Sequence, residues 1–239
     1  AILFRLRKVW VRTDMRYLIT QTLLSSWNYL FSCREESKDD AYADFMDTLN
    51  RTPKLTTPEM QNGIDFENLV YSIANGTFKV PFAPTGETAT VMGDTVIMES
   101  GKLPKWYNGA KAVATLITGA PVQVKAQREV SIAGMDLLVY GVLDALKAAT
   151  IFDVKFSNKG FGSAELAGKY LESPQHPTYL FLIPDAIKFT YLVSDGEDIY
   201  TETYTRRNTR PFEEIAKEFL DSLRDMKLLE VYKSKWAAR

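Results

Sequence analysis

The pattern of apolar residues changes from helical to strand-like at Gly119-Ala120-Pro121, and this change limits the folds that the chain can adopt. Before it, apolar residues recur at helical spacing from about Lys105 to Thr118. After it, apolar and β-branched runs predict three successive strands, at Val122 to Ile132, Leu137 to Leu146 and Ile151 to Phe156. A helix followed directly by three strands predicts a sheet with a helical cover.

The rest of the chain continues this alternation of elements. A helix is predicted from Ser163 through Tyr179, and strands are predicted around Lys188 to Val193 and Ile199 to Thr205. Asp195-Gly196 between these strands is a hairpin signal, and Pro211 opens an amphipathic helix. The order helix, three strands, helix, two strands and helix indicates the α/β class.

The N-terminal third is predicted to be helical. One helix contains Leu23 to Phe31, a second surrounds Tyr42 to Leu49, and a third begins at Pro58 and stops at Asn75-Gly76. The segment from Thr77 to Gly101 mixes prolines and glycines with short apolar runs. We interpret it as an irregular excursion that covers or borders a functional site.

Composition excludes several classes of protein. The apolar fraction of 46% is enough to build a core, and no run of about 18 apolar residues predicts a membrane span. No signal segment opens the chain, so we expect a cytoplasmic protein without membrane contact. Cys33 is the single cysteine; it cannot form an internal disulfide or build a zinc site alone, and we expect it to be a packing residue.

The formal net charge of -1 neither favours nor excludes nucleic acid, because a phosphate-binding surface needs only local positive charge. Two basic groups lie far apart in the sequence, and each would suit a strand of DNA or form an ordinary solvated face. They are Lys102, Lys105, Lys111, Lys125 and Arg128 in the first group, and Arg206, Arg207 and Arg210 in the second.

Two acids and one amine are predicted to share a patch of the sheet. Asp153 and Lys155 are two residues apart in a strand, so their side chains project from the same face. If the preceding strand folds back through a tight turn at Ala148-Ala149, Asp144 lies directly across from Asp153. Carboxylates placed so close repel each other unless a cation lies between them.

This patch suggests metal-assisted hydrolysis. Oxygen ligands suit Mg²⁺ or Mn²⁺, and a water activated by such an ion can attack a phosphodiester. Lys155 would hold or polarise that water and offset charge on the phosphate. The alternative for an isolated Asp-x-Lys is a solvated strand with a salt bridge, so the tripeptide alone decides little.

Three motifs occur together and resemble a known family. Gly141-Val-Leu-Asp144, Asp153-Val-Lys155 and Gln175-His-Pro-Thr-Tyr179 resemble the series found in RecB-like and lambda-exonuclease-like nucleases of the PD-(D/E)XK superfamily. The resemblance covers roughly Gly63 to Thr205. It implies a restriction-endonuclease-like αβββαβ core, with a mixed central sheet flanked by helices and an added helical N-terminal region.

The resemblance also implies roles for individual residues. Asp144, Asp153 and the backbone carbonyl of Val154 would be metal ligands, and Lys155 would be the catalytic lysine. Gln175 and Tyr179 are one helical turn apart and would border the site, where they contact DNA or order the water. Tyr179 has the alternative of an aromatic residue at the edge of the core.

A third acidic ligand is expected upstream. Gly63-Ile-Asp-Phe-Glu67 resembles the family's helix in which histidine or glutamate follows a glycine by four residues, so we assign Glu67 as catalytic residue and ligand. Asp65 points elsewhere, because each helical residue turns by about 100°, and it is one rival of Glu67. Glu129 on the first strand is the second rival.

Two further residues are expected to take no part in the chemistry. The helix around Ser25 to Cys33 is similar to one in RecB-like relatives that ends in the first of four cluster-binding cysteines, but the other three are absent here, so we expect no iron-sulfur cluster. His176 is the single histidine and has no partners for a triad or a zinc site. We expect it on the surface or near DNA, without a catalytic role.

The sequence therefore predicts a magnesium-dependent DNA nuclease, an exonuclease or end-processing enzyme of recombination, repair or phage replication, encoded by a bacterium or a phage. We expect a single nuclease domain over 1–239, with a helical region at 1–57, the core at 58–205 and a C-terminal helix at 206–239. The analogy extends to a homo-oligomer and to a recombination partner protein. The alternatives are a non-catalytic nucleic-acid-binding module with a nuclease fold and a purely structural domain. Strand polarity, exonuclease against endonuclease action, and DNA against RNA preference stay open.

Overall fold

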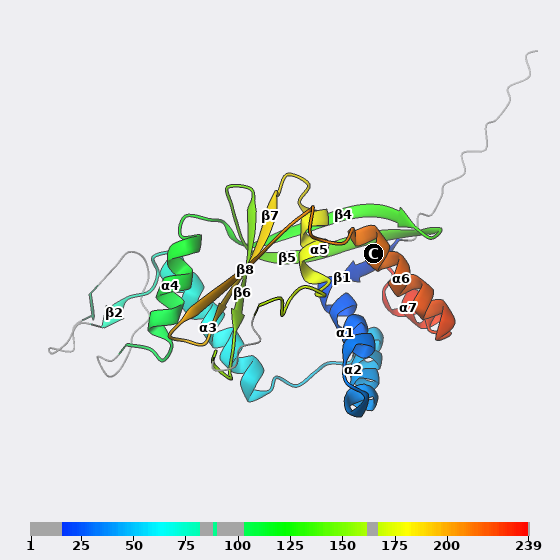
Figure 1. Ribbon diagram of the computed structural model, residues 1–239, viewed down its shortest axis with the longest axis horizontal. Coiled ribbons are helices and arrows are strands. Elements are labelled where there is room, and N and C mark those ends of the chain that lie inside the picture. The colour runs from blue at the N-terminus through cyan, green and yellow to red at the C-terminus, as the bar shows by residue number, and fades with distance from the viewer. Residues whose placement is uncertain (1–15, 82–87, 90–102, 162–166, 239) are drawn as a thin grey trace, which may run out of the picture.

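The computed structural model describes residues 16–81, 88–89, 103–161 and 167–238 (Figure 1). The elements are β1 (Tyr17–Thr20), α1 (Gln21–Ser32), η1 (Glu35–Ser37), α2 (Lys38–Asn50), α3 (Pro58–Ala74), β2 (Val80–Pro81), β3 (Thr88–Ala89), α4 (Tyr107–Ile117), β4 (Val122–Ile132), β5 (Met135–Lys147), β6 (Thr150–Phe156), α5 (Gln175–Leu182), β7 (Lys188–Ser194), β8 (Ile199–Thr205), α6 (Phe212–Asp225) and α7 (Leu229–Lys235).

Six strands form one mixed sheet, in the order β1-β5-β6-β7-β8 with β4 also paired to β5. The pairs β4–β5, β5–β6 and β7–β8 are antiparallel, while β1–β5 and β6–β7 are parallel. The parallel β6–β7 pair requires a crossover, and the chain makes it through α5. Helices flank this sheet, which confirms the α/β expectation.

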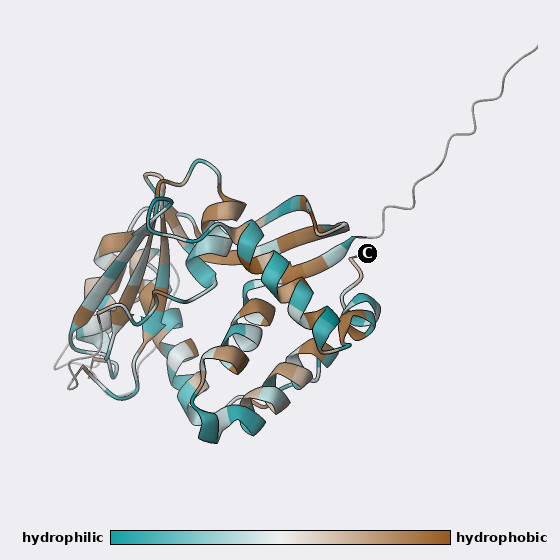
Figure 2. Ribbon diagram, turned by 45° about the vertical axis from the view of Figure 1, so that its right-hand side comes forward, coloured by the Kyte–Doolittle hydropathy of each residue, from teal (hydrophilic) through white to brown (hydrophobic). Residues whose placement is uncertain are grey.

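Figure 1 shows α3 and α4 together at one end of the molecule and α1, α2, α6 and α7 together at the other, in agreement with the packing of these helices on one another. Within the described ranges, no helix has the length and apolar character of a membrane span. Figure 2 shows apolar and polar residues alternating along the strands, as expected for a sheet whose two faces differ in environment.

The hydrophobic interior divides into two clusters that meet on β5. The larger cluster joins the sheet to α1, α2, α5, α6 and α7 and includes Leu143. The smaller cluster lies under α3 and α4 and includes Ala145 and Val154. Asp144 lies between Leu143 and Ala145 in the sequence, at the part of β5 where the two clusters adjoin.

All five predicted strands coincide with observed strands, namely β4, β5, β6, β7 and β8, but one predicted helix is wrong. Instead of a helix from Ser163 through Tyr179, residues 167–174 form turns and α5 begins at Gln175. Gly168 has a φ of 78°, which ends any helix there, and Pro174 directly precedes α5. The strand β1 was not predicted. Most of the expected excursion from Thr77 to Gly101, like residues 162–166, lies outside the described residues.

Candidate active site

A tight turn joins β5 to β6. Lys147 pairs with Thr150, so Ala148 and Ala149 alone form the connection. Their φ angles are 46° and 60°, both in the left-handed region that a two-residue turn of type I′ requires. The predicted reversal at Ala148-Ala149 is confirmed, although alanine is an unfavourable residue for this conformation.

This turn fixes the register that brings the two aspartates together. Ala145 and Phe152 form the last pair of this ladder, and Asp144 and Asp153 are the next residues on the two strands. The Val154 backbone N–H donates to Asp144 Oδ2 at 2.7 Å. The Asp144 side chain is therefore bonded directly to β6, next to the backbone pairing of β5 with β6.

Asp153 is buried, with its side chain only 3% exposed. Gln175 Nε2 donates to Asp153 Oδ1, and Lys155 Nζ lies 2.8 Å from Asp153 Oδ2. Beyond this ion pair, Oδ2 has no hydrogen bond within the described ranges. One oxygen of a buried carboxylate thus has unused capacity to accept a donor or to bind a cation.

The electrostatics of this patch show a shortage of positive charge. Burial, and then the neighbouring Asp153, raise the pKa of Asp144 to about 8, although Lys155 and the Val154 N–H act in the opposite direction. Burial also raises the pKa of Asp153. Burial alone would lower the pKa of Lys155, but the nearby carboxylates outweigh it and raise that pKa. The single ammonium group does not neutralise both aspartates.

Helix α3 adds Glu67 and Tyr71, which are four residues apart and therefore on one face. Burial and Asp153 raise the pKa of Glu67, while Lys155 lowers it. The Tyr71 hydroxyl accepts a hydrogen bond from Gln123 Nε2 at 2.9 Å and also interacts with Asp144, and burial, Asp144 and Glu67 raise its pKa. Tyr71 was missed by the sequence reasoning, although its spacing from Glu67 was the available signal.

Both rivals of Glu67 are engaged elsewhere. Asp65 is exposed and accepts from Gln61 Nε2 at 2.7 Å along α3. Glu129 forms an ion pair with Arg16. We call Glu67, Asp144, Asp153 and Lys155 the acidic patch.

The donor chemistry of the acidic patch fits a hard divalent cation. Mg²⁺ is held in proteins by one or two carboxylates and keeps several waters. Asp153 Oδ2, which forms the ion pair with Lys155 and has no hydrogen bond within the described ranges, lies near a second carboxylate, Asp144. Among the described residues, no three His, Cys, Asp or Glu side chains converge as a ligand group. Glu67 and the Val154 carbonyl as further ligands stay predictions.

Tyr179 of α5 packs against β5 close to the acidic patch. Its hydroxyl donates to the Val142 carbonyl at 2.9 Å, and its ring lies against Gly141, where an added Cβ would be 2.5 Å from Tyr179 Cε1. The side chain is buried at 6% exposure. Of the two residues expected to border the site, Gln175 contacts Asp153, and Tyr179 packs α5 against β5; burial and then Asp153 and Asp144 raise the Tyr179 pKa.

The expected surface position of His176 is wrong. It is 1% exposed, its ring stacks on Tyr204 with centroids 4.0 Å apart, and Nδ1 lies 3.3 Å from the Tyr191 hydroxyl. Burial lowers its pKa to about 4, so it is a neutral core residue. Cys33 is half-buried and packs against the larger cluster, as expected of a packing residue.

No family model matches this chain, and no curated protein matches it. A solved structure described as "Crystal structure of SSO0001" is similar to it, with 15% sequence identity, a TM-score of 0.46, and coverage of 91% of this chain and 79% of the other. That likeness carries no argument about function. The case for a function therefore depends on the geometry of the acidic patch.

Proposed function

We propose that this chain is a metal-dependent nuclease that hydrolyses phosphodiester bonds of DNA, with the restriction-endonuclease-like core of the PD-(D/E)XK superfamily. The observation that carries the proposal is the meeting of Asp144, Asp153 and Lys155 at the β5–β6 junction, with both carboxylates short of positive charge. Asp144 and Asp153 would hold Mg²⁺. When bound, the cation supplies positive charge between the carboxylates and Lewis-acid polarisation of the scissile phosphate.

Lys155 would be the catalytic lysine. Its side chain is 34% exposed, and Asp153 holds its ammonium group in place. Because the carboxylates keep this amine protonated, it would orient water and offset charge that develops on the phosphate rather than act as a base.

Two residues would position these groups. Gln175 donates to Asp153 Oδ1 and leaves Oδ2 for the ion pair and a cation. Tyr71 interacts with Asp144 from α3, the helix that also carries Glu67. Glu67 is the proposed third acid, because it shares the electrostatic environment of Lys155 and Asp153.

The test is incubation of the purified chain with linear duplex, circular duplex and single-stranded DNA, with Mg²⁺, with Mn²⁺ and with a chelator. Cleavage that requires the metal supports the proposal, and the choice among the three substrates separates exonuclease from endonuclease action. DNA binding without metal-dependent cleavage would favour a non-catalytic binding module. Neither cleavage nor binding would favour a structural domain, and either result would overturn the nuclease.

A matched pair of variants on α3 tests the role of Glu67. Glu67→Gln should reduce cleavage by roughly 10²-fold if the carboxylate supports the cation. Asp65→Asn, two residues earlier but hydrogen-bonded to Gln61, should leave cleavage within about twofold of the wild type. Equal effects of the two changes would remove Glu67 from the site.

A further inference from the structure

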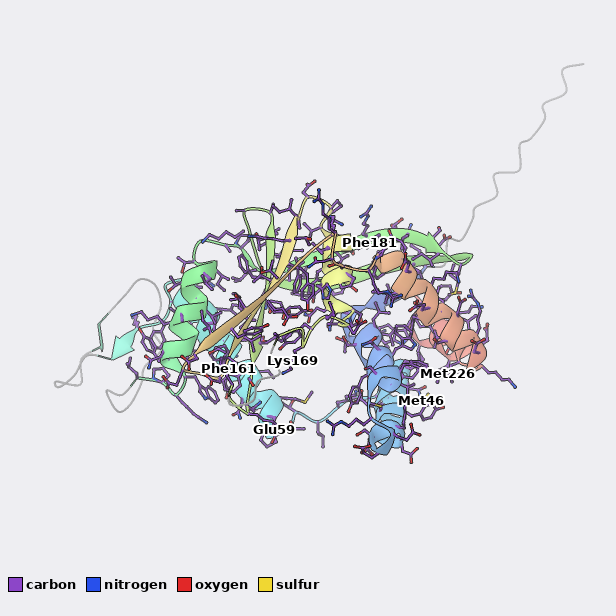
Figure 3. The ribbon with its side chains drawn as sticks, in the orientation of Figure 1. Met46, Glu59, Phe161, Lys169, Phe181 and Met226 are labelled. Carbon is purple, nitrogen blue, oxygen red and sulfur yellow. The ribbon has the colours of Figure 1, made fainter. Side chains whose placement is uncertain are left out.

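One residue of the first basic group and two of the second meet at one pocket of the folded chain. Arg128 from β4 joins Arg206 and Arg210, from the segment between β8 and α6, around a pocket of about 230 Å³. Figure 3 labels Phe181 near the start of α6, and its ring stacks on Phe212 with centroids 4.5 Å apart. We call this site the arginine pocket.

Neutral groups hold two of the arginines in place. The Arg128 guanidinium lies 4.4 Å from the centroid of the Phe181 ring, and its Nη1 donates to the Phe181 carbonyl at 2.9 Å. Arg206 Nη2 donates to the Leu180 carbonyl at 2.6 Å and to two further carbonyls at the end of α5. Carbonyl oxygens orient a guanidinium without cancelling its charge, and each arginine keeps N–H groups for a ligand.

The remaining charges leave an excess of positive charge. Arg210 forms an ion pair with Glu218 at 2.6 Å, so it contributes little. Glu213 lines the pocket with a carboxylate. Within the described parts of the chain, neither Arg128 nor Arg206 forms an ion pair with a carboxylate. Two uncompensated guanidinium groups therefore face one carboxylate.

Two further features of the arginine pocket supply hydrogen-bond donors that lack acceptors in the described structure. The 14-residue helix α6 begins at the pocket, and its N-cap, Pro211, makes no side-chain capping bond. The Thr209 hydroxyl also lines the pocket, is buried, and has no hydrogen-bond partner in the described structure. A helix N-terminus with free N–H groups favours an anion, and a buried hydroxyl without a partner needs one.

We propose that the arginine pocket binds a phosphate group, held by Arg128, Arg206, the Thr209 hydroxyl and the N-terminus of α6. Its volume is below the roughly 300–1,000 Å³ of sites for larger ligands, so it suits a phosphoryl group rather than a whole nucleotide. The phosphate comes either from a polynucleotide backbone or from the free anion. This binding goes beyond the proposed cleavage, because it requires neither the metal nor Lys155.

The experiment uses the full chain in a chelator, so that metal-dependent cleavage plays no part. Thermal unfolding is followed against inorganic phosphate, with sodium chloride at equal ionic strength as reference, since a ligand of the folded state raises the melting temperature in a saturable manner. In parallel, fluorescence anisotropy measures binding of a labelled oligonucleotide. The two arms separate the free anion from the backbone phosphate.

Four variants locate the effect. Arg128→Gln and Thr209→Val should each weaken phosphate or oligonucleotide binding, by about tenfold for the charged group and less for the hydroxyl. Glu213→Gln should strengthen binding, because it removes the opposing carboxylate. Arg207→Gln is the matched control, because Arg207 is an exposed neighbour of Arg206 that does not line the pocket, and it should stay within about threefold of the wild type.

The outcomes decide the proposal. Saturable binding in either arm that is lost in Arg128→Gln and kept in Arg207→Gln supports it, whether or not the chain cleaves DNA. Equal stabilisation by phosphate and chloride, together with oligonucleotide binding that does not depend on Arg128, would overturn it. Equal losses in Arg128→Gln and Arg207→Gln would also overturn it, since they would indicate a general effect of surface charge.

Discussion

The two sides of α5 have opposite electrostatic character. On one side, Gln175 contacts Asp153 in the acidic patch. On the other, Pro177 and Phe181 line the arginine pocket. At about 100° of rotation per residue, Pro177 and Phe181 lie about 200° and 240° around the helix from Gln175, so a single short helix separates the two regions.

The difference shows how a nearly neutral protein can carry two strong local charges. In the acidic patch, carboxylates outnumber the single amine, and the pKa of Asp144 rises to about 8. In the arginine pocket, Arg128 and Arg206 donate to carbonyl oxygens instead of carboxylates. Each region lacks the charge that the other has in excess, which suggests ligands of opposite sign: a cation in the patch and a phosphate in the pocket.

The largest expected effect is on cleavage by Lys155→Ala. Loss of the amine should reduce cleavage by roughly 10³-fold, because it removes the protonated group that would face the phosphate. It should also destabilise the fold, since buried Asp153 loses its ion-pair partner 2.8 Å away. Single-turnover cleavage with Mg²⁺, together with circular dichroism of the variant, measures both effects.

Lys159→Ala is the control for this change, because Lys159 is an exposed lysine in the turn that follows β6. It should cleave at the wild-type rate. Phosphate binding in the arginine pocket should survive Lys155→Ala, which would sharpen the contrast between the two sides of α5. Wild-type cleavage by a folded Lys155→Ala protein would contradict the proposed chemistry.

The second largest effect concerns how the free energy of unfolding of the metal-free protein changes with pH. The unfolded chain releases the Asp144 proton near its ordinary pKa of 3.8, whereas the folded chain keeps it until about pH 8. The stabilisation is therefore complete below about pH 4 and is lost as pH rises toward 8, with an expected loss of roughly 2–4 kcal/mol. Chemical denaturation at a series of pH values measures it.

Asp144→Asn should reduce this pH dependence, because the amide does not titrate, whereas Asp153, whose pKa burial also raises, keeps part of it; the change should also weaken the response to Mg²⁺. Mg²⁺ should restore the stability of the wild type at pH 8 by neutralising the carboxylates. Asp65→Asn serves as the control and should keep the wild-type pH profile. An unchanged magnesium titration in Asp144→Asn would remove it from the ligand set.

Local sequence patterns predicted those features of the two charged regions that depend on residues close together in the sequence. The β5–β6 hairpin follows from two strand patterns and a short connection, and the same-face rule placed Asp153 with Lys155. These features involve separations of a few residues. The same approach found α3, α4 and α6, whose apolar faces repeat at helical spacing.

Contacts between distant segments were not predictable in the same way. Tyr71 meets Asp144 only because α3 packs against β6, and β1 was missed because its parallel partner lies more than 100 residues away, at Leu137 to Tyr140. His176 was misplaced because α5 is buried along its whole length. The convergence of Arg128 with Arg206 likewise needs the folded sheet.

A third prediction tests whether α5 separates the acidic patch from the arginine pocket. Gly141→Ala would place a Cβ 2.5 Å from the Tyr179 ring and should cost about 1–3 kcal/mol of stability. Because α5 would shift from β5, cleavage and phosphate binding should both decline.

Gly63→Ala, in a helix where an added Cβ meets nothing within 4 Å, should instead stabilise the protein by up to about 1 kcal/mol. Opposite signs in thermal unfolding support this account, and no loss in Gly141→Ala would contradict it.

The smallest expected effect concerns the turn that builds the acidic patch. Ala148 and Ala149 both have positive φ, so the double change Ala148→Asn and Ala149→Gly should stabilise the protein by about 1 kcal/mol, since these residues prefer a type I′ turn. Ala133→Asn in the β4–β5 turn, where φ is 50°, is the matched control outside the patch. If the register of β5 and β6 sets the separation of Asp144 and Asp153, the double change should leave the pH dependence of stability intact, because it fixes the same register more firmly. Lower stability, measured by chemical denaturation, would mean that the reversal has another geometry and that the two aspartates do not face each other across it.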